Sequence, residues 1–277
     1  MPRGISLHVG INEYSSAFPG AGKLEGCRND AVAMEKIAKD SGFEQRDLLL
    51  GCDATYMRVT AKILSAASQL EKDDIFFFSF AGHGYQHGDK IFGGDERDGL
   101  DETLLLFDAE LFDDVLRKEL WPRFKPGVRI LMVADSCHSE TANFVPPTDN
   151  EDGNSPPPDM PVTPGGSGAI RSVKPGAGDR HLEEYGEFYR SIKLPSDTTI
   201  SASIMLLAAC LDMQTTGDGN PNGVYTDAML KVLESKPVDY FALREGIQKI
   251  FDDADRDQTP TISMEGPDFR GQKPFMI

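Results

Sequence analysis

Short apolar runs recur along the chain, and stretches with helical spacing separate them. Strands are expected at 5–10, 47–50, 74–80, 130–134 and 203–210, and helices at about 29–41, 55–70, 111–124, 226–233 and 240–251. Short runs of this kind are typical of strands that are buried on both faces. Repeated strand–helix units favour a mostly parallel central sheet with helices on both faces. We therefore expect an α/β fold of three layers.

Local signals refine two of the helices. Asn29 or Asp30 can serve as the N-cap of the first helix, and Gly42 can end it. Thr55 can cap the second helix. The buried positions are expected to be Ala33, Ile37 and Ala38 in the first helix and Met57, Ile63, Leu64, Ala67 and Leu70 in the second.

Two segments break the strand–helix pattern. Residues 85–114 are rich in Asp and Glu and are expected to form a loop-rich insertion. Residues 144–197 are rich in Pro and Gly, so they bury little apolar surface and are expected to form a mobile loop, with one short helix around 183–191. Because the pattern resumes afterwards, we expect a single domain over residues 1–277, with the 144–197 loop inserted in it.

Two of the expected strands end in polar clusters that carry reactive side chains. Strand 130–134 runs into Asp135, Ser136 and Cys137, and strand 74–80 runs into Ala81, Gly82 and His83. Ligand sites in parallel sheets lie beyond the carboxyl ends of the strands. If the two strands are neighbours, a thiol and an imidazole meet there as a nucleophile and its base. His138 is a rival base, but consecutive residues of a strand point apart.

Charge and cysteine content narrow the class of partner. The net charge is −17, which argues against a nucleic acid or an anionic membrane as partner and favours basic peptides. No apolar run reaches the ~20 residues that span a bilayer, and no signal-peptide pattern opens the chain. The four cysteines are too scattered for a disulfide framework. We expect a protein of the reducing cytoplasm.

Several ordered motifs resemble those of one known family. The segment around His83 and the segment around Cys137 resemble the two catalytic motifs of metacaspases and their prokaryotic relatives, the orthocaspases, within the caspase-like cysteine peptidases. Further segments are similar to the family's other motifs. The matching segments are Leu24–Ala31, Phe80–Gln86, Gly94–Thr103, Ala134–Ser139, Cys210–Thr215 and Gly223–Thr226.

The resemblance implies a caspase-like three-layer sandwich that cleaves peptide bonds with a His/Cys dyad. Cys137 would be the attacking thiolate, and His83 would donate a proton to the leaving amine. The backbone N–H groups of Gly84 and Cys137 would stabilise the oxyanion, where losing one donor costs ~100-fold or more in rate.

The resemblance also places a substrate pocket for the residue before the cleaved bond, the S1 pocket. Asp30 and Asp135 would make it anionic and select Arg or Lys, with Cys27 on its wall. Ala81 stands where the family usually has Ser, so one polar contact is missing. From the residues alone, the alternatives are that Asp30 is a charge at a helix N-terminus and that Asp135 is a structural hydrogen-bond acceptor.

Calcium is a possible cofactor by the same resemblance. Asp98, Asp113 and Asp114 fall where calcium-dependent metacaspases carry aspartates, and clustered carboxylates suit Ca²⁺. A fourth family aspartate is missing, because Asn143 and Phe144 occupy that region. Acid-rich segments are also commonly just solvated.

The 144–197 loop contains basic cleavage sites at Arg171 and Arg180. Exposed loops are preferred sites of proteolysis. Our hypothesis is that the protein is a zymogen, and that cleavage after Arg171, by another copy or by an upstream protease, frees the substrate cleft. An unregulated surface insertion is the alternative.

The leading interpretation is an Arg/Lys-specific cysteine endopeptidase that acts on basic protein or peptide substrates as a monomer. A catalytically silent caspase-like scaffold, or regulatory binding protein, is the first alternative. A small-molecule thiol hydrolase on the same sheet is the second. A nucleotide-binding domain is disfavoured because no Gly-rich phosphate loop is present.

Overall fold

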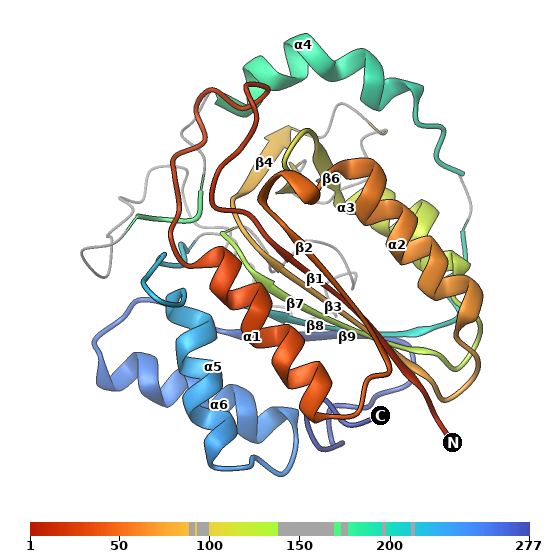
Figure 1. The fold of residues 1–277 in the computed structure, drawn as a ribbon, viewed down its shortest axis with the longest axis vertical. Helices are drawn as coiled ribbons and strands as arrows, with labels where there is room; N and C mark the ends of the chain where they lie inside the picture. Colours follow the sequence, from red (N-terminus) through yellow and green to blue (C-terminus); the bar gives the residue numbers. More distant parts are fainter. Residues whose placement is uncertain (89–91, 93–99, 138–168, 173–176, 196–197, 212–213) are drawn as a thin grey trace, which may run out of the picture.

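A six-stranded sheet with strand order β2-β1-β3-β7-β8-β9 forms the centre of the molecule (Figure 1). The computed structural model describes residues 1–88, 92, 100–137, 169–172, 177–195, 198–211 and 214–277. The strands of this sheet are β1 (Gly4–Gly10), β2 (Gln45–Leu50), β3 (Ile75–Ala81), β7 (Arg129–Asp135), β8 (Ser203–Ala208) and β9 (Thr261–Glu265). All neighbours pair in parallel except β8 and β9, which are antiparallel. The mostly parallel sheet predicted from the sequence is confirmed.

Helices cover both faces of this sheet and give the three layers expected (Figure 1). The main helices are α1 (Cys27–Asp40), α2 (Tyr56–Gln69), α5 (Val224–Glu234) and α6 (Tyr240–Asp253). On one face, Phe77 of β3 packs in a core with residues of α1, α5 and α6. On the other face, Phe76 and Phe78 share a core with Ile63 of α2. Successive β3 side chains enter opposite cores because side chains alternate along a strand.

A second, smaller sheet replaces the loop-rich insertion expected at 85–114. It contains β4 (Gly84–Gly88), β5 (Leu100–Leu105) and β6 (Glu110–Phe112) in antiparallel order. Leu104 pairs with Leu111, and both are buried in the α2-side core. The expectation of a loop was therefore wrong. Acidic residues interrupt the apolar positions in the sequence, but apolar side chains on one side of this sheet are buried in the core.

The expected helix at 111–124 begins two residues later, because Leu111 and Phe112 belong to β6. Short helical turns then follow as α3 (Asp113–Val115), η2 (Leu116–Leu120) and η3 (Trp121–Arg123), and η1 (Gly51–Asp53) precedes α2. Helix α4 (Ala177–Ser191) is longer than the 183–191 helix predicted, and it lies beside β4 (Figure 1). The rest of the 144–197 segment lies largely outside the described residues.

The predicted helix ends agree with the structure better than the predicted buried positions do. Gly42 ends α1 with a φ of +88°, and the Thr55 hydroxyl accepts the Arg58 N–H as the cap of α2. Helix α1 begins at Cys27, so Asn29 and Asp30 lie in its first turn and are not its cap. Some predicted core positions were wrong: Met57 and Leu64 are exposed, and Ala33 and Ile37 are only half-buried. Among the described residues, no helix has the length and apolarity needed to cross a membrane.

Candidate active site

The ends of β3 and β7 bring the two reactive side chains to one edge of the sheet. Ala81 of β3 pairs directly with Asp135 of β7. His83 lies two residues after Ala81, and Cys137 lies two residues after Asp135. The backbones stay close beyond the strands, because a Cβ added to Gly84 would lie 2.0 Å from the Cys137 carbonyl oxygen. Glycine is therefore required at position 84 by this close approach.

The hydrogen bonds of His83 define its tautomer. Its Nε2 lies 2.8 Å from the carbonyl oxygen of Gly22, which can only accept, so Nε2 carries the proton. Its Nδ1 is buried and has no hydrogen-bond partner among the described residues. The backbone N–H of His83 donates to the Tyr14 hydroxyl at 2.7 Å. Burial lowers the pKa of His83, so the imidazole is neutral near pH 7 and Nδ1 offers a lone pair.

The thiol of Cys137 is also buried and uncharged in this structure. Its Sγ accepts a hydrogen bond from the backbone N–H of Thr216 at 3.3 Å and lies 3.8 Å from the Thr216 carbonyl oxygen. Burial raises the pKa of the Cys137 thiol to about 12, although the Thr216 N–H and the Arg171 guanidinium lower it. The thiol must therefore be deprotonated by a base, or become more exposed to water so that its pKa falls, before the sulfur can attack as a thiolate.

Arg171 presents its backbone to the same two residues. The carbonyl oxygen of Arg171 accepts the N–H of Gly84 at 3.1 Å and the N–H of Cys137 at 3.3 Å. The N–H of Arg171 donates to the Thr216 carbonyl oxygen at 3.1 Å, and the Asp218 N–H donates to the Ala169 carbonyl oxygen at 2.7 Å. Residues 169–171 therefore lie as an extended, antiparallel strand along residues 216–218, with an isolated bridge between 170 and 217.

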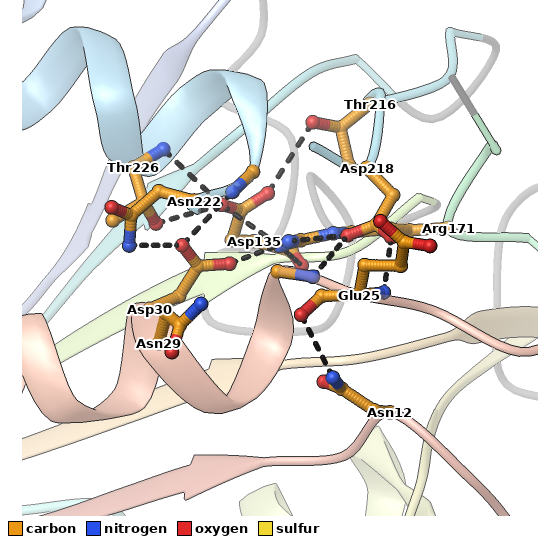
Figure 2. A network of polar contacts seen from close by, with 12 residues as sticks. Asn12, Glu25, Asn29, Asp30, Asp135, Arg171, Thr216, Asp218, Asn222 and Thr226 are labelled. Carbon is orange, nitrogen blue, oxygen red and sulfur yellow. Dashed lines mark hydrogen bonds and ion pairs between the residues drawn. The ribbon is translucent and has the colours of Figure 1, made fainter. Parts of the chain in front are cut away.

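The side chain of Arg171 is fully buried among three carboxylates (Figure 2). Its Nη2 contacts Asp30 and lies 3.0 Å from Oδ1 of Asp218. Its Nη1 lies 2.9 Å from Oδ2 of Asp135 and donates to the Asp135 carbonyl oxygen at 3.0 Å. Three segments that are distant in sequence thus converge on one guanidinium.

The carboxylates around the guanidinium are themselves held by hydrogen bonds. Asp30 accepts from the Asn222 side chain at 2.9 Å and from the Gly223 N–H at 3.0 Å. Asp135 accepts from the N–H of Thr226 at 3.2 Å and from its hydroxyl at 2.8 Å, both in the first turn of α5. These donors keep the carboxylates aimed at the pocket, and the helix N-terminus favours their negative charge.

Charge and burial oppose each other in this pocket. Burial raises the pKa of Asp30 to about 6, the Arg171 guanidinium lowers it, and the Asp135 carboxylate adds to the rise. Burial by itself lowers the pKa of Arg171, but Asp135, Asp30 and Asp218 together raise it well above its usual value. The guanidinium therefore stays charged, and it neutralises part of a strongly anionic pocket.

The structure brings together most of the residues predicted for the site. Asp30 and Asp135 both contact Arg171, while Cys27 and Ala81 lie in one small buried cluster with Leu24. Asp30 lies in the first turn of α1 as well as in the pocket, so the two interpretations of this residue do not exclude each other.

Thr216 and Asp218 were missed from the sequence. Both follow β8, which pairs with β7, so they lie beyond the same carboxyl edge as Cys137. That edge rule could have suggested them, but nothing in the sequence indicates how far the chain travels after the strand ends.

Other predicted residues stay untested. Asp98 and His138 lie outside the described residues, as does the side chain of Arg180. Asp113 and Asp114 are buried at the start of α3, and Asp114 lies 2.8 Å from Nζ of Lys118. Within the described part of the chain, no three His, Cys, Asp or Glu side chains gather closely enough to hold a metal ion. The calcium hypothesis therefore stays a prediction, and no step below uses a metal.

Comparison with known proteins agrees with this architecture. A family model described as the caspase domain matches residues 3–268. Metacaspase-1 of Kluyveromyces lactis is 29% identical over 84% of this chain, and Metacaspase-1 of Schizosaccharomyces pombe is 26% identical over 95% of it. The chain spans only 59% and 67% of the lengths of these two relatives.

A solved structure matches over nearly the full length of both chains. The crystal structure of protein GSU0716 from Geobacter sulfurreducens is 33% identical, with a TM-score of 0.80, and the match covers 100% of this chain and 99% of that one. The resemblance to metacaspases drawn from the sequence motifs is confirmed. Because the family model matches nearly the whole chain, the chain belongs to the caspase-domain family.

Proposed function

We propose that this chain is a cysteine endopeptidase that cleaves after a basic residue, with Cys137 as nucleophile and His83 as general base and acid. One observation carries the proposal. Arg171 lies in the site as a substrate residue would, with its side chain among three carboxylates and its carbonyl oxygen on the N–H groups of Gly84 and Cys137. The supporting sequence evidence is membership of the caspase-domain family.

The geometry suggests a sequence of proton transfers. Nδ1 of His83 takes the thiol proton of Cys137, and the sulfur attacks the carbonyl carbon of the basic residue. The oxygen of that carbonyl gains the negative charge and stays hydrogen-bonded to the N–H groups of Gly84 and Cys137. His83 then gives its proton to the leaving amine, and a thioester remains. Water, deprotonated by His83, hydrolyses the thioester and restores the thiol.

Backbone groups orient two of these residues. The Gly22 carbonyl fixes the proton of His83 on Nε2, which leaves Nδ1 as the basic nitrogen. The Thr216 N–H donates to the sulfur and favours its thiolate form over the thiol. Burial raises the pKa of Cys137 and so acts against the thiolate form.

The docked segment, residues 169–171, supports control by self-cleavage. While Arg171 occupies the pocket, no other basic side chain can enter it. Cleavage of the Arg171–Ser172 bond would convert this inhibitory segment into a product that can leave. Arg180 is a poorer site, because its backbone belongs to helix α4 and a protease needs an extended strand. An upstream protease that cuts in the same segment would have the same effect.

The test uses the full chain and three reporter peptides that end in Arg, Lys or Asp before the fluorophore. We expect Arg and Lys reporters to be cleaved, the Asp reporter to be untouched, and Cys137→Ala to cleave none. Cys52→Ala is the matched control, because Cys52 is exposed and lies outside the site. Mass spectrometry should find a fragment that begins at Ser172. If purified protein cleaved none of the reporters with or without calcium, a silent scaffold would be the better interpretation.

A further inference from the structure

We propose that Tyr14 is a positioning residue for His83, and that helix α4 holds Tyr14 in place through Phe18 and His181. The inference rests on the proposed function, because it concerns how the proposed base is kept in line with the thiol. The hydrogen bond itself can be tested without any activity. Tyr14, Phe18 and His181 all lie outside the segments that match the family's motifs.

His83 lies at the junction between the two sheets, where the main sheet no longer holds its backbone. Strand β3 ends at Ala81, and β4 of the small sheet begins at Gly84. The carbonyl oxygen of His83 accepts the N–H of Leu105 at 3.0 Å. Its own N–H donates to the hydroxyl of Tyr14 at 2.7 Å. The backbone of the proposed base is therefore held on one side by the small sheet and on the other by Tyr14.

The order of the strands brings Tyr14 to this junction. Gly10 at the end of β1 pairs with Ala81 at the end of β3, so the segment after β1 begins beside the segment that carries His83. A Cβ added to Gly82 would lie only 2.8 Å from the hydroxyl oxygen of Tyr14. Glycine before the histidine therefore leaves the space through which this hydroxyl reaches the backbone N–H.

The ring of Tyr14 also lies against the imidazole. The ring centroids of Tyr14 and His83 are 5.3 Å apart, and the two planes are tilted by 33°. The carbonyl oxygen of Gly22, further along the same loop, accepts the Nε2 proton at 2.8 Å. Loop residues 14–22 thus contact the backbone, the ring and one nitrogen of His83. A shift of this loop moves the basic Nδ1 relative to the sulfur, and a displacement of about 1 Å can cost ~100-fold in rate.

Helix α4 packs against the middle of this loop (Figure 1). Nδ1 of His181 lies 3.1 Å from the carbonyl oxygen of Ala17, and the His181 ring stacks on Phe18 with centroids 4.2 Å apart. The Phe18 ring in turn meets the Tyr14 ring edge-on at 6.0 Å. Burial lowers the pKa of His181, so the neutral ring donates from Nδ1 to Ala17 and accepts the Tyr189 hydroxyl at Nε2, 2.7 Å away.

The place of α4 in the chain gives this contact a consequence for maturation. The helix follows the Arg171–Ser172 bond, so cleavage there leaves α4 on the C-terminal fragment. The hydroxyl of Tyr189 also accepts the N–H of Glu110 at 2.6 Å, which connects the helix to β6. The helix should therefore stay docked when segment 169–171 leaves, and His83 should stay oriented.

Amide hydrogen exchange in the inactive Cys137→Ala chain, measured by NMR, tests the hydrogen bond directly. We expect Tyr14→Phe to make the His83 amide exchange about tenfold faster, the effect of losing one hydrogen bond. The matched control is Tyr240→Phe, because the Tyr240 hydroxyl accepts the Phe275 N–H at 2.9 Å in the core beside α5 and α6. This control loses the same kind of bond and should leave the His83 amide unchanged. An unchanged His83 amide in Tyr14→Phe would overturn the inference.

Activity separates positioning from stability. In mature enzyme, Tyr14→Phe should lower kcat for Arg reporters about tenfold and keep KM within about twofold, because the bond positions the base and not the substrate. Tyr240→Phe should leave both constants unchanged. An equal fall of kcat in the two variants would mean a general loss of stability and would overturn the positioning role. If no reporter is cleaved while the His83 amide still responds to Tyr14→Phe, the peptidase proposal fails and the contact between Tyr14 and His83 stands.

Substitutions in the contact with α4 test the second step. Phe18→Leu keeps an apolar side chain but removes the stacked ring, and we expect kcat to fall about threefold. His181→Asn keeps an amide N–H that can donate to the Ala17 carbonyl, so it should lose less activity than His181→Leu. Phe188→Leu is the control on the same helix, because Phe188 is exposed and lies against Tyr56. Parental kcat in both Phe18→Leu and His181→Leu would overturn the role of α4.

Discussion

The backbone N–H of Thr216 donates to the sulfur of Cys137 at 3.3 Å. The carbonyl of the same residue accepts the N–H of Arg171 at 3.1 Å, and its hydroxyl donates to Asp135 at 3.3 Å. Thr216 thus connects the sulfur of Cys137, the backbone of the docked segment and the wall of the pocket. Small displacements of this residue should therefore affect binding and reaction together.

Gln258 should control the position of Thr216 without touching the docked segment. Its Nε2 donates to the Thr216 hydroxyl at 3.1 Å and to the Ala209 carbonyl oxygen at 2.8 Å. We predict that Gln258→Ala lowers kcat/KM for Arg reporters about tenfold. Gln258→Glu should not restore the loss, because a carboxylate cannot donate to the Thr216 hydroxyl, whose single proton already goes to Asp135. The half-exposed Gln45→Ala is the control, and an unchanged kcat and KM in Gln258→Ala would refute the positioning role.

Chemical labelling should report whether the segment is docked. With residues 169–171 in place, Cys137 is buried and its pKa is raised to about 12, whereas Cys52 is exposed. Iodoacetamide should modify Cys52 in the intact chain and leave Cys137 unmodified. After cleavage at Arg171, Cys137 should become the faster of the two, because it gains access to water and keeps the Thr216 N–H. Peptide mapping by mass spectrometry measures both rates, and rapid labelling of Cys137 in the uncut chain would contradict this account.

The proposed dyad makes a direct prediction for two substitutions. Cys137→Ala and His83→Ala should each lower turnover of Arg reporters by about 10³-fold or more, since nucleophile and base act as a unit and their effects do not add. The double variant should be no worse than either single variant. His87→Ala is unsuitable as a control, because His87 is buried against Glu110 at 2.7 Å; Cys52→Ala serves instead. A His83→Ala enzyme with parental kcat would exclude the proposed base.

Binding of arginine substrates should weaken in mild acid. With the Arg171 guanidinium beside it, the pKa of Asp30 is about 6, and because that guanidinium lowers it, Asp30 in the emptied pocket holds its proton to a higher pH. A protonated Asp30 loses its attraction for a guanidinium, so KM for Arg reporters should rise as the pH falls towards 6 and below. Asp30→Asn should raise KM at pH 7.5 and remove this part of the pH dependence. The acid limb should stay in Asp218→Asn, although with a higher KM throughout.

The raised pKa of Asp30 affects folding stability in the opposite direction to substrate binding: acid weakens binding but favours the folded state. The native carboxyl of Asp30 holds its proton to a higher pH than an unfolded one, whose pKa is about 3.9. Considered alone, Asp30 stabilises the fold below that value, and this contribution is lost as pH rises from about 4 to about 6. Urea unfolding of the Cys137→Ala chain and its Asp30→Asn variant at several pH values measures the difference. A difference between the two proteins that did not change across this range would contradict the raised pKa.

Removal of the docked guanidinium should abolish maturation. We predict that Arg171→Ala gives no fragment starting at Ser172, whereas Arg180→Ala matures at the parental rate. Arg171→Ala should also be less stable than the parent, because three buried carboxylates lose their counter-charge. Gel analysis and differential scanning calorimetry test the two effects separately. Normal self-cleavage in Arg171→Ala would mean that another bond is the processing site.

The succession of the main strands and helices along the chain could be predicted from the sequence, because a strand that is buried on both faces appears as a continuous apolar run. The run in β3 and the run in β7 therefore predicted a parallel sheet, and the edge rule for such sheets placed His83 and Cys137 together. The small sheet β4–β6 was missed since its apolar positions are separated by acids. Strand β9 was missed since its residues are only half-buried and leave no apolar run.

The sequence by itself determined the fold class and the placement of His83 and Cys137 at one edge of the sheet, because both follow from local patterns and from where strands end. Only the tertiary structure decided which residues complete the pocket. Asp218 and Gly223 reach Arg171 through a loop after β8, and the partners Asp30 and Asp218 are far apart in the chain. Such contacts depend on the path of loops across the sheet edge, and that path is set by packing and hydrogen bonding over the whole domain rather than by any local run of residues.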